Sequence, residues 1–291
     1  MIALLPQNNI NMATKGIVGK FLHVASVLIH GEPKPVIANI SYLSPSEKLK
    51  GRKIIVTGGG RGLGFAMAKR FIVEGADVLI AGRNEEVLKN SANSIGCKYL
   101  KLDVQQIDGF REFINKADSM LDGVNCLVNN AGISLHENSI LEVSQEQFDS
   151  QINTNFRGPY FLAKAFMEKC NLHSEKGIKN ILFISSETSM TVDERPYGLT
   201  KAAVNSLVEG LAHKYVKQGY RINALAPGVT LSDMVGKKDG SNLAGGGITG
   251  RYYLPEEVAE VATFLLSDVS NILNGQIIVC NEGNTINARW K

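Results

Sequence analysis

The sequence predicts an α/β fold in which helices cover both faces of a parallel β-sheet. From about residue 51 onward, short β-branched or apolar runs alternate with longer segments of helical periodicity, as in repeated strand–helix–strand units. The apolar runs are nearly continuous, as expected for strands that are buried on both faces. Hydrophobic residues make up 44% of the chain and charged residues 20%, which excludes a fibrous or wholly disordered protein.

About seven strands are expected, separated by helices. In chain order, the predicted strands are Lys53–Thr57, Val78–Ala81, Tyr99–Leu102, Cys126–Val128, Asn180–Ile184, Arg221–Leu225 and Gln276–Val279. The predicted helices are Leu63–Glu74, Asp108–Ser119, Gln145–Lys169, Tyr197–Val216 and Glu256–Leu266.

The chain divides into an N-terminal extension, residues 1–50, and one main domain, residues 51–291. Breaker segments at Glu32–Pro35 and Ser44–Glu47 separate the two. The extension is expected to be helical or partly disordered. Its apolar stretch Ile17–Ile29 fits a helix packed on the main domain or on a partner subunit, with membrane-surface association of residues 1–30 as the less favoured alternative.

Charge and cysteine usage exclude several classes of function. The 31 basic and 28 acidic residues give a net charge of +3, too balanced for a nucleic-acid-binding protein. The four cysteines show no CxxC spacing, so neither a metal site nor a disulfide framework is predicted. Reduced thiols indicate a cytoplasmic protein.

A glycine-rich loop joins the first strand to the first helix. It reads Thr57-Gly58-Gly59-Gly60-Arg61-Gly62-Leu63-Gly64. Glycine lets the chain turn sharply and lets the backbone approach a pyrophosphate, which the N–H groups at the start of the helix then bind. We therefore expect a dinucleotide to be held by Thr57, Gly58, Gly60, Arg61, Gly62, Leu63 and Gly64.

The end of the second strand indicates which nicotinamide is bound. An acidic residue there binds a ribose 2′-hydroxyl, whereas arginine binds a 2′-phosphate. This strand ends in Gly82-Arg83-Asn84, and Arg61 adds a second cation. NADP(H) is the preferred cofactor, with NAD(H) as the alternative because Glu85 and Glu86 lie nearby.

Tyr197 and Lys201 are four residues apart in a predicted helix, so their side chains share one face. Holding a tyrosine of pKa about 10 as tyrosinate near pH 7 costs about 4 kcal/mol. One cation at about 4 Å offsets up to about 4 kcal/mol at an effective dielectric constant of 20. The pair therefore suits acid–base catalysis at a carbonyl or alcohol.

The segments Thr57–Gly64, Asn129-Asn130-Ala131-Gly132 and Tyr197-x-x-x-Lys201 together resemble the short-chain dehydrogenase/reductase family, from Gly51 to about Gly283. This resemblance implies a Rossmann-type, doubly wound, three-layer α/β/α fold of about seven strands. It also implies further cofactor-binding residues, namely Asp103, Val104, Asn129, Ala131, Gly132, Tyr197, Lys201, Pro227, Gly228, Val229 and Thr230, with Ser232 as a further candidate. It suggests a homodimer or homotetramer.

The resemblance also completes a catalytic set. Ser186 would hold the substrate carbonyl oxygen, and Asn155 would support a proton relay beside Tyr197 and Lys201. Ser186 lies 11 residues before Tyr197, where the family usually has about 13, so Ser185 is the fallback. Asn281-Glu282-Gly283 stands where the family often has Asp-Gly-Gly.

The predicted function is an NAD(P)(H)-dependent oxidoreductase acting on a small carbonyl or alcohol. A 3-oxoacyl-thioester reductase is the main expectation. A sugar, polyol or other secondary-alcohol dehydrogenase is the alternative, and a non-catalytic NADP-binding sensor or structural protein is a third. The substrate is expected near Ile133–Glu137, Met190–Arg195 and Val235–Arg251, where Lys237 and Lys238 would favour an anionic substrate.

Overall fold

The computed structural model describes residues 47–172, 177, 179–232, 245 and 247–286. Nearly all of the predicted N-terminal extension, and with it the predicted membrane-surface segment, lies outside these residues. So do Lys237 and Lys238. The boundary at residue 51 stays a prediction, although Leu49 is already completely buried in the core.

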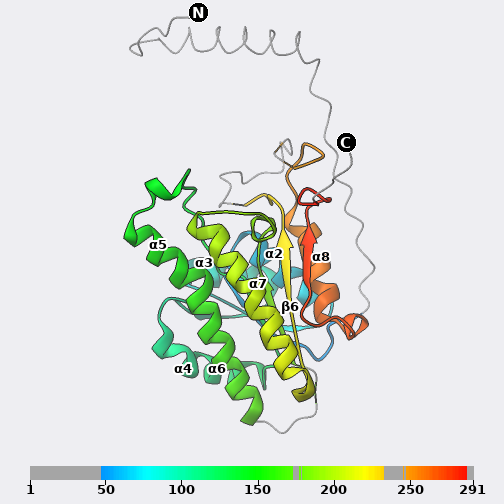
Figure 1. Ribbon diagram of the computed structural model, residues 1–291. Helices are drawn as coiled ribbons and strands as arrows, with labels where there is room; N and C mark the ends of the chain where they lie inside the picture. Colours follow the sequence, from blue (N-terminus) through cyan, green and yellow to red (C-terminus); the bar gives the residue numbers. More distant parts are fainter. Residues whose placement is uncertain (1–46, 173–176, 178, 233–244, 246, 287–291) are drawn as a thin grey trace, which may run out of the picture. The chain divides into compact units, whose positions relative to one another are not determined.

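Seven parallel strands form one sheet, which confirms the predicted fold class (Figure 1). The strand order is β3-β2-β1-β4-β5-β6-β7, so the chain moves outward from β1 in one direction and then from β4 in the other. The strands are β1 (Lys53–Thr57), β2 (Asp77–Gly82), β3 (Lys98–Lys101), β4 (Cys126–Asn129), β5 (Lys179–Ile184), β6 (Tyr220–Pro227) and β7 (Ile277–Cys280).

Successive residues of the central strands point to opposite faces of the sheet. In β1, Ile54 and Val56 join one core cluster, whereas Ile55 joins the other, and all three are completely buried. Burial on both sides explains why these strands read as continuous apolar runs.

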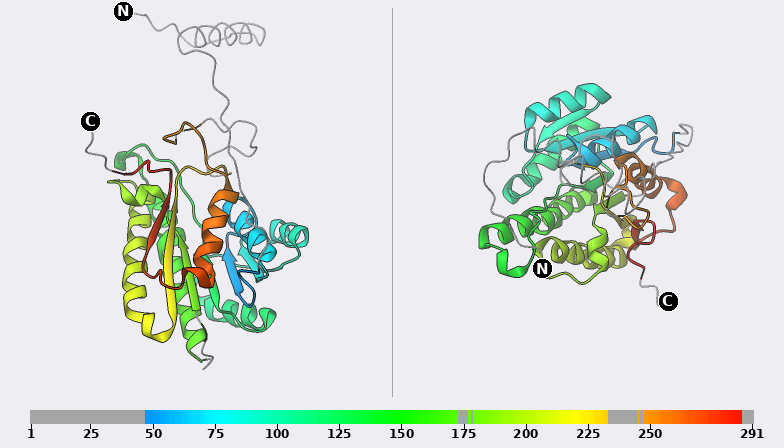
Figure 2. Two further views of the ribbon diagram at one scale, coloured as in Figure 1. Left: turned by 90° about the vertical axis from the view of Figure 1, so that its right-hand side faces the viewer. Right: turned by 90° about the horizontal axis from the view of Figure 1, so that it is seen from above.

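Helices cover both faces (Figures 1 and 2). On one face lie α2 (Gly62–Val73), α3 (Glu85–Ile95) and α8 (Pro255–Leu266), and on the other lie α4 (Phe110–Leu121), α6 (Gly158–Leu172) and α7 (Pro196–Tyr215). A shorter helix, α5 (Gln145–Ile152), precedes α6. Figure 2 shows α7 and α8 on opposite sides of the sheet.

Two helices differ from the expectation. The sequence reading missed α3, which begins after Asn84, whose side chain accepts a bond from Val87 N–H, and ends at Gly96 in the left-handed conformation. The single helix expected over residues 145–169 is interrupted by a π-helical turn, Asn153–Arg157. Such turns hold one extra residue and are frequent at functional sites.

Candidate active site

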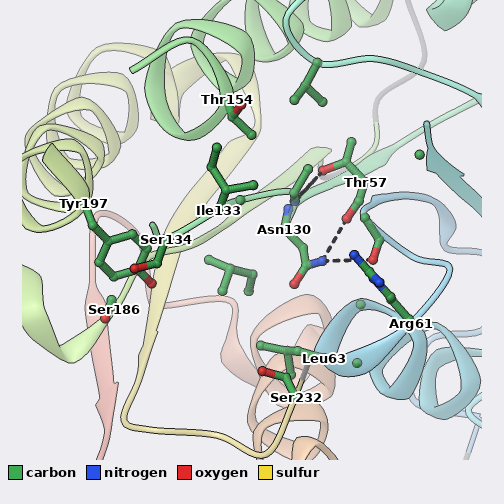
Figure 3. Close-up of a pocket in the computed structure, with 18 of the residues that line it drawn as sticks. Thr57, Arg61, Leu63, Asn130, Ile133, Ser134, Thr154, Ser186, Tyr197 and Ser232 are labelled. Atoms are coloured by element: carbon green, nitrogen blue, oxygen red, sulfur yellow. Dashed lines mark hydrogen bonds between the residues drawn. The ribbon is translucent and has the colours of Figure 1, made fainter. Parts of the chain in front are cut away.

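A cavity of about 750 Å³ lies at the carboxyl ends of the strands. Its walls come from the segments that follow β1, β2, β3, β4, β5 and β6. Ligands bind at this edge in open α/β sheets, where the strand order reverses, here between β1 and β4. In the close-up, Tyr197 and Ser186 lie at one end of the cavity, and Thr57, Asn130 and Arg61 lie at the other (Figure 3).

Most of the predicted site residues line this cavity. They are Thr57, Gly58, Gly60, Arg61, Gly62, Leu63, Gly64, Arg83, Asp103, Val104, Ala131, Gly132, Ser186, Tyr197, Lys201, Pro227, Gly228, Val229, Thr230 and Ser232. Asn129 and Asn155 lie behind the wall instead.

The glycine loop has the backbone that a pyrophosphate requires. Gly58 and Gly62 have positive φ angles of 65° and 53°, which side chains rarely allow. A Cβ atom on Gly64 would lie 2.3 Å from the Gly58 carbonyl oxygen, so only glycine lets α2 pack against the loop. Arg61, at the N-cap, makes no side-chain cap bond, so the first N–H groups of α2 are not bonded to its side chain.

Asn130 fixes this loop to the segment after β4. Its Nδ2 donates to the Thr57 carbonyl at 2.9 Å, and its backbone N–H donates to Thr57 Oγ1 at 3.0 Å. Asn129, the neighbour that the sequence reading placed in the cofactor site, is 4% exposed, and neither side-chain polar atom has a hydrogen-bond partner among the described residues. Because Asn129 and Asn130 are adjacent and identical, the sequence alone could not show which of them lines the cavity.

The end of the cavity opposite Tyr197, at the tip of β2, is basic. Arg61 and Arg83 are both exposed and line it. Glu85 and Glu86, which weakened the prediction of NADP(H), form the first turn of α3 and are not part of the cavity wall.

Tyr197, Ser186 and Lys201 converge at the other end. The Ser186 side chain lies beside the Tyr197 phenol and lowers its pKa (Figure 3). Lys201 Nζ lies 5.6 Å from the centre of the Tyr197 ring. The same ammonium, which is almost completely buried, donates to the Ile184 carbonyl at 2.8 Å.

The geometry separates the two candidate serines. Ser185 Oγ points into α7, where it donates to Asn205 Oδ1 at 2.7 Å and to the Lys201 carbonyl at 3.3 Å. Ser186 Oγ faces the cavity beside Tyr197 and accepts bonds from Thr188 N–H and Oγ1–H. The spacing of 11 residues therefore still brings Ser186 to the tyrosine.

Asn155 lies in the π-helical turn and holds the segment after β4. Its Oδ1 accepts from Ile133 N–H and its Nδ2 donates to the Ile133 carbonyl, both at 2.8 Å. It also donates to Thr200 Oγ1 on α7 at 3.3 Å. Asn155 thus links two walls of the site without reaching into the cavity.

Burial dominates the electrostatics of the tyrosine–lysine pair. It raises the pKa of Tyr197, and the nearby charge of Glu187 raises it further, against the hydrogen bond from Ser186, which lowers it. Burial also lowers the pKa of Lys201 to about 8. The expectation that Lys201 lowers the pKa of Tyr197 is therefore wrong for this geometry, because burial is the largest cause of the shift and it raises the pKa.

The opposite wall follows β6. Gly228 N–H donates to the Cys280 carbonyl at 2.9 Å, and a Cβ on Gly228 would lie 2.5 Å from the Tyr253 ring. This close approach keeps Val229 and Thr230 at the cavity.

The substrate end is more polar than predicted. Ile133–Glu137 line it as expected, together with Asp193 and Arg195 from the predicted segment Met190–Arg195. Arg195 Nε and Nη2 donate to the two oxygens of Asp193 at 2.8 and 3.0 Å. The described part of Val235–Arg251 is not in the wall. The sequence reading missed Glu187, Thr188 and Thr154, which carry no motif of their own.

These features fit a dinucleotide. The glycine loop, residues 57–64, leaves space that side chains would take up. The Arg61 side chain does not cap the start of α2, and Arg61 and Arg83 line the cavity near the tip of β2. Asp103, Val104, Val229 and Thr230 line the same cavity.

Comparisons with known proteins agree with this site. The family model described as enoyl-(acyl carrier protein) reductase matches residues 58–285. The chain is 31% identical over 246 residues to the 3-oxoacyl-(acyl-carrier-protein) reductase of Chlamydia pneumoniae, covering 81% of this chain and 98% of that protein. It is 32% identical over 253 residues to the L-rhamnose 1-dehydrogenase (NADP(+)) of Thermoplasma acidophilum, covering 82% and 98%.

Among solved structures, a short-chain dehydrogenase from Burkholderia cenocepacia in complex with NADP superimposes with a TM-score of 0.72 at 25% identity, covering 82% of this chain and 99% of that one. The predicted Rossmann-type fold, family and oxidoreductase class are thereby confirmed. Sequence, fold and site together show that the chain belongs to the short-chain dehydrogenase/reductase family, whose members are nicotinamide-dependent oxidoreductases.

Proposed function

We propose that this protein reduces a ketone to a secondary alcohol with NADPH and catalyses the reverse oxidation with NADP⁺. The observation that carries this proposal is the convergence of Ser186, Tyr197 and Lys201 at one end of a cavity with a glycine cradle. NADP(H) is the cofactor because Arg61 and Arg83 line the outer end, where a 2′-phosphate would be held. One relative is named as an NADP(+) dehydrogenase, and one similar solved structure is a complex with NADP.

NADPH held in this cavity would supply a hydride for the substrate carbonyl carbon. Tyr197 gives its phenolic proton to the carbonyl oxygen, so the product is an alcohol. The raised pKa keeps Tyr197 protonated, as a proton donor requires. The Ser186 hydroxyl orients the carbonyl oxygen beside the phenol.

Lys201 stabilises the negative charge that develops on Tyr197 as the proton leaves. At 5.6 Å from the ring centre, one ammonium contributes up to about 3 kcal/mol at an effective dielectric constant of 20. The same ammonium would bind the nicotinamide ribose. Asn155 acts through Ile133 by fixing the backbone beside the reaction centre, and a relayed proton would pass near it.

The relatives differ in the substrate class that their names give. One is named as a 3-oxoacyl-(acyl-carrier-protein) reductase, which supports the thioester prediction. Another is named as a rhamnose dehydrogenase, which supports the sugar and polyol alternative.

The experiment is a screen of ketones with NADPH and NADH, and of secondary alcohols with NADP⁺ and NAD⁺, followed at 340 nm (the nicotinamide absorbance). Turnover that prefers the phosphorylated cofactor is the expected result. Binding of NADPH without turnover of any carbonyl would favour the non-catalytic sensor.

We further propose that the protein is a cytoplasmic homodimer or homotetramer. Its four cysteines form no disulfide, as in a reducing compartment. Phe148 on α5 and Tyr160 on α6 are 42% and 43% exposed, on the helices through which subunits would pair. No helix among the described residues is long and apolar enough to cross a membrane.

A further inference from the structure

Two carboxylates stand in the cavity wall beside the proposed reaction centre. Glu187 directly follows Ser186, and Glu137 ends the segment that Asn155 holds at Ile133. Neither belongs to the serine–tyrosine–lysine set. Their presence is unexpected for a pocket that accepts an acyl chain, because unsatisfied carboxylates are costly against an apolar ligand.

Each carboxylate is fixed from behind by a carboxamide side chain. Gln151 Nε2 on α5 donates to Glu137 Oε1 at 2.5 Å. Asn281 and Asn284 Nδ2, after β7, donate to the same oxygen of Glu187, Oε2, at 2.9 and 3.1 Å. Both anchors come from elements outside the cavity wall, so the carboxylates are held in position before any substrate enters.

Each carboxylate has a second oxygen, Oε1 of Glu187 and Oε2 of Glu137, that accepts no hydrogen bond from the described residues. Because both residues line the cavity, these oxygens are available to a ligand. A carboxylate oxygen accepts hydrogen bonds, so its natural ligand group is a donor such as a hydroxyl.

The third carboxylate of this wall, Asp193, is already paired with an arginine. Asp193 receives two bonds from the Arg195 guanidinium and one from Arg195 N–H at 3.1 Å. Arg195 Nη1 donates to the Glu137 carbonyl at 3.5 Å, which ties this ion pair to Glu137. The arginine is thus neutralised locally and offers little attraction to an anionic substrate.

The remaining charges at this end are few. Lys201 is bonded to the Ile184 carbonyl, and His136 has interactions of its own. Glu137 and Glu187 therefore leave the wall without surplus positive charge, which disfavours a carboxylate-bearing substrate.

We propose that Glu137 and Glu187 determine specificity and select an uncharged polyhydroxylated substrate, a sugar or polyol, by accepting bonds from hydroxyl groups near the reacting carbon. This inference rests on the proposed function and narrows its substrate class. A site built to bond a substrate hydroxyl rejects the analogue that lacks it, because the buried acceptor is then left unpaired.

The test compares kcat/KM with NADP(H) for four substrate classes. They are neutral sugars and cyclic polyols, the matched deoxy alcohol or ketone, a sugar acid, and a short 3-oxoacyl thioester. We expect the neutral polyol to exceed its deoxy analogue and the sugar acid by about tenfold or more.

The variants are Glu187→Leu and Glu137→Leu, with Glu194→Leu as the matched control. Glu194 is exposed in the same loop as Asp193 and does not line the cavity. The ratio of polyol to deoxy kcat/KM should fall about tenfold or more in the two cavity variants and stay within about twofold in the control.

Glu187→Leu carries the test if Glu137→Leu does not fold, since Glu187 is only partly buried. Folding is checked by NADPH binding. Preference of the unmodified protein for the thioester, or an unchanged ratio in Glu187→Leu, overturns the inference while the proposed oxidoreductase function stands. NADPH binding without turnover in any class overturns both.

Discussion

At Ser186 the chain leaves β5 in an extended conformation, with φ of −160°, and its hydroxyl caps the short 3₁₀ turn that follows. The bond from Thr188 fixes the Oγ atom beside Tyr197 rather than leaving it to rotate. One residue earlier, Ser185 faces the helix. Neighbouring residues of an extended chain point to opposite sides, which is why Ser186 faces Tyr197 and Ser185 does not.

Tyr197→Phe removes the proposed proton donor and leaves the ring in place. Turnover should fall by about 10² to 10⁴, because that is the contribution of a positioned acid. NADPH affinity, measured by fluorescence titration, should stay close to that of the unmodified protein. Turnover that survives in this variant would assign the proton to another group.

Arg83→Ala should weaken discrimination between the two nicotinamides. Loss of a charge-assisted bond to a 2′-phosphate lowers kcat/KM for NADPH by about 10- to 100-fold and leaves that for NADH nearly unchanged. Arg111→Ala, an exposed arginine of α4 outside the cavity, is the control. Equal losses with both cofactors would contradict a 2′-phosphate contact.

Lys201→Met should stabilise the protein at pH 7. With a folded pKa of about 8 and an ordinary value of 10.5, the unfolded chain binds more protons between these pH values, so the penalty of the buried ammonium is complete below pH 8 and disappears as pH rises toward 10.5. The penalty is roughly 3 kcal/mol at neutral pH.

Urea denaturation at pH 7 and at pH 9.5 measures this effect. The gain from Lys201→Met should shrink by about half at the higher pH. Lys217→Met, an exposed lysine after α7, should show no such trend. A gain that is independent of pH would mean that packing, not charge, is responsible.

At the scale of single elements, close backbone contacts determine how a helix is positioned more than helix propensity does. A Cβ on Gly158, the first residue of α6, would lie 2.1 Å from the Val104 carbonyl oxygen. This contact sets α6 directly against the segment that follows β3 in the cavity wall. Nothing in the sequence around Gly158 showed that its neighbour would be backbone.

Gly158→Ala should therefore destabilise the fold by about 1–3 kcal/mol, since backbone must shift to accept the methyl group. Gly210→Ala is the matched control in α7, where a Cβ meets nothing within 4 Å. That variant should gain about 0.5–1 kcal/mol through helix propensity. Thermal unfolding compares the two, and similar effects would contradict the contact.

The elements that the sequence failed to predict share a physical cause. Helix α3 carries its caps at Asn84 and Gly96, but its apolar face is narrow, with only Leu88 and Ala92 buried. The π-helical turn has no residue signature, because it arises from what α5 and α6 pack against. The strands were predictable because burial on both faces requires a continuous run of apolar residues, which exposed segments do not have.

For the molecule as a whole, the order of motifs along the chain predicted the sheet and the position of the cavity. Only part of the wall proposed to select a substrate was predictable: Glu137 lies in a predicted segment, whereas Glu187 does not. Glu187 and Asn281 are 94 residues apart in sequence, and they come into contact only through the two successive crossovers from β5 to β6 and from β6 to β7.

Assembly supplies a prediction at the same scale. Phe148→Asp places a charge on the exposed apolar part of α5, and it should shift the protein toward the monomer in sedimentation velocity. Val73→Asp, at the exposed end of α2 and outside the helices proposed to pair, is the control. A species of unchanged mass in the Phe148 variant would place the subunit contact elsewhere.

The π-helical turn between α5 and α6 ties the reaction centre to the interior of the protein. Each residue of an α-helix advances the chain by about 100° around its axis. Because the turn already absorbs one extra residue, deleting one residue from Asn153–Arg157 would restore a regular α-helix and leave Leu162 and Phe166 in the core. The same deletion would remove the bonds between Asn155 and Ile133, so the extra residue serves the proposed reaction centre and not the packing of α6.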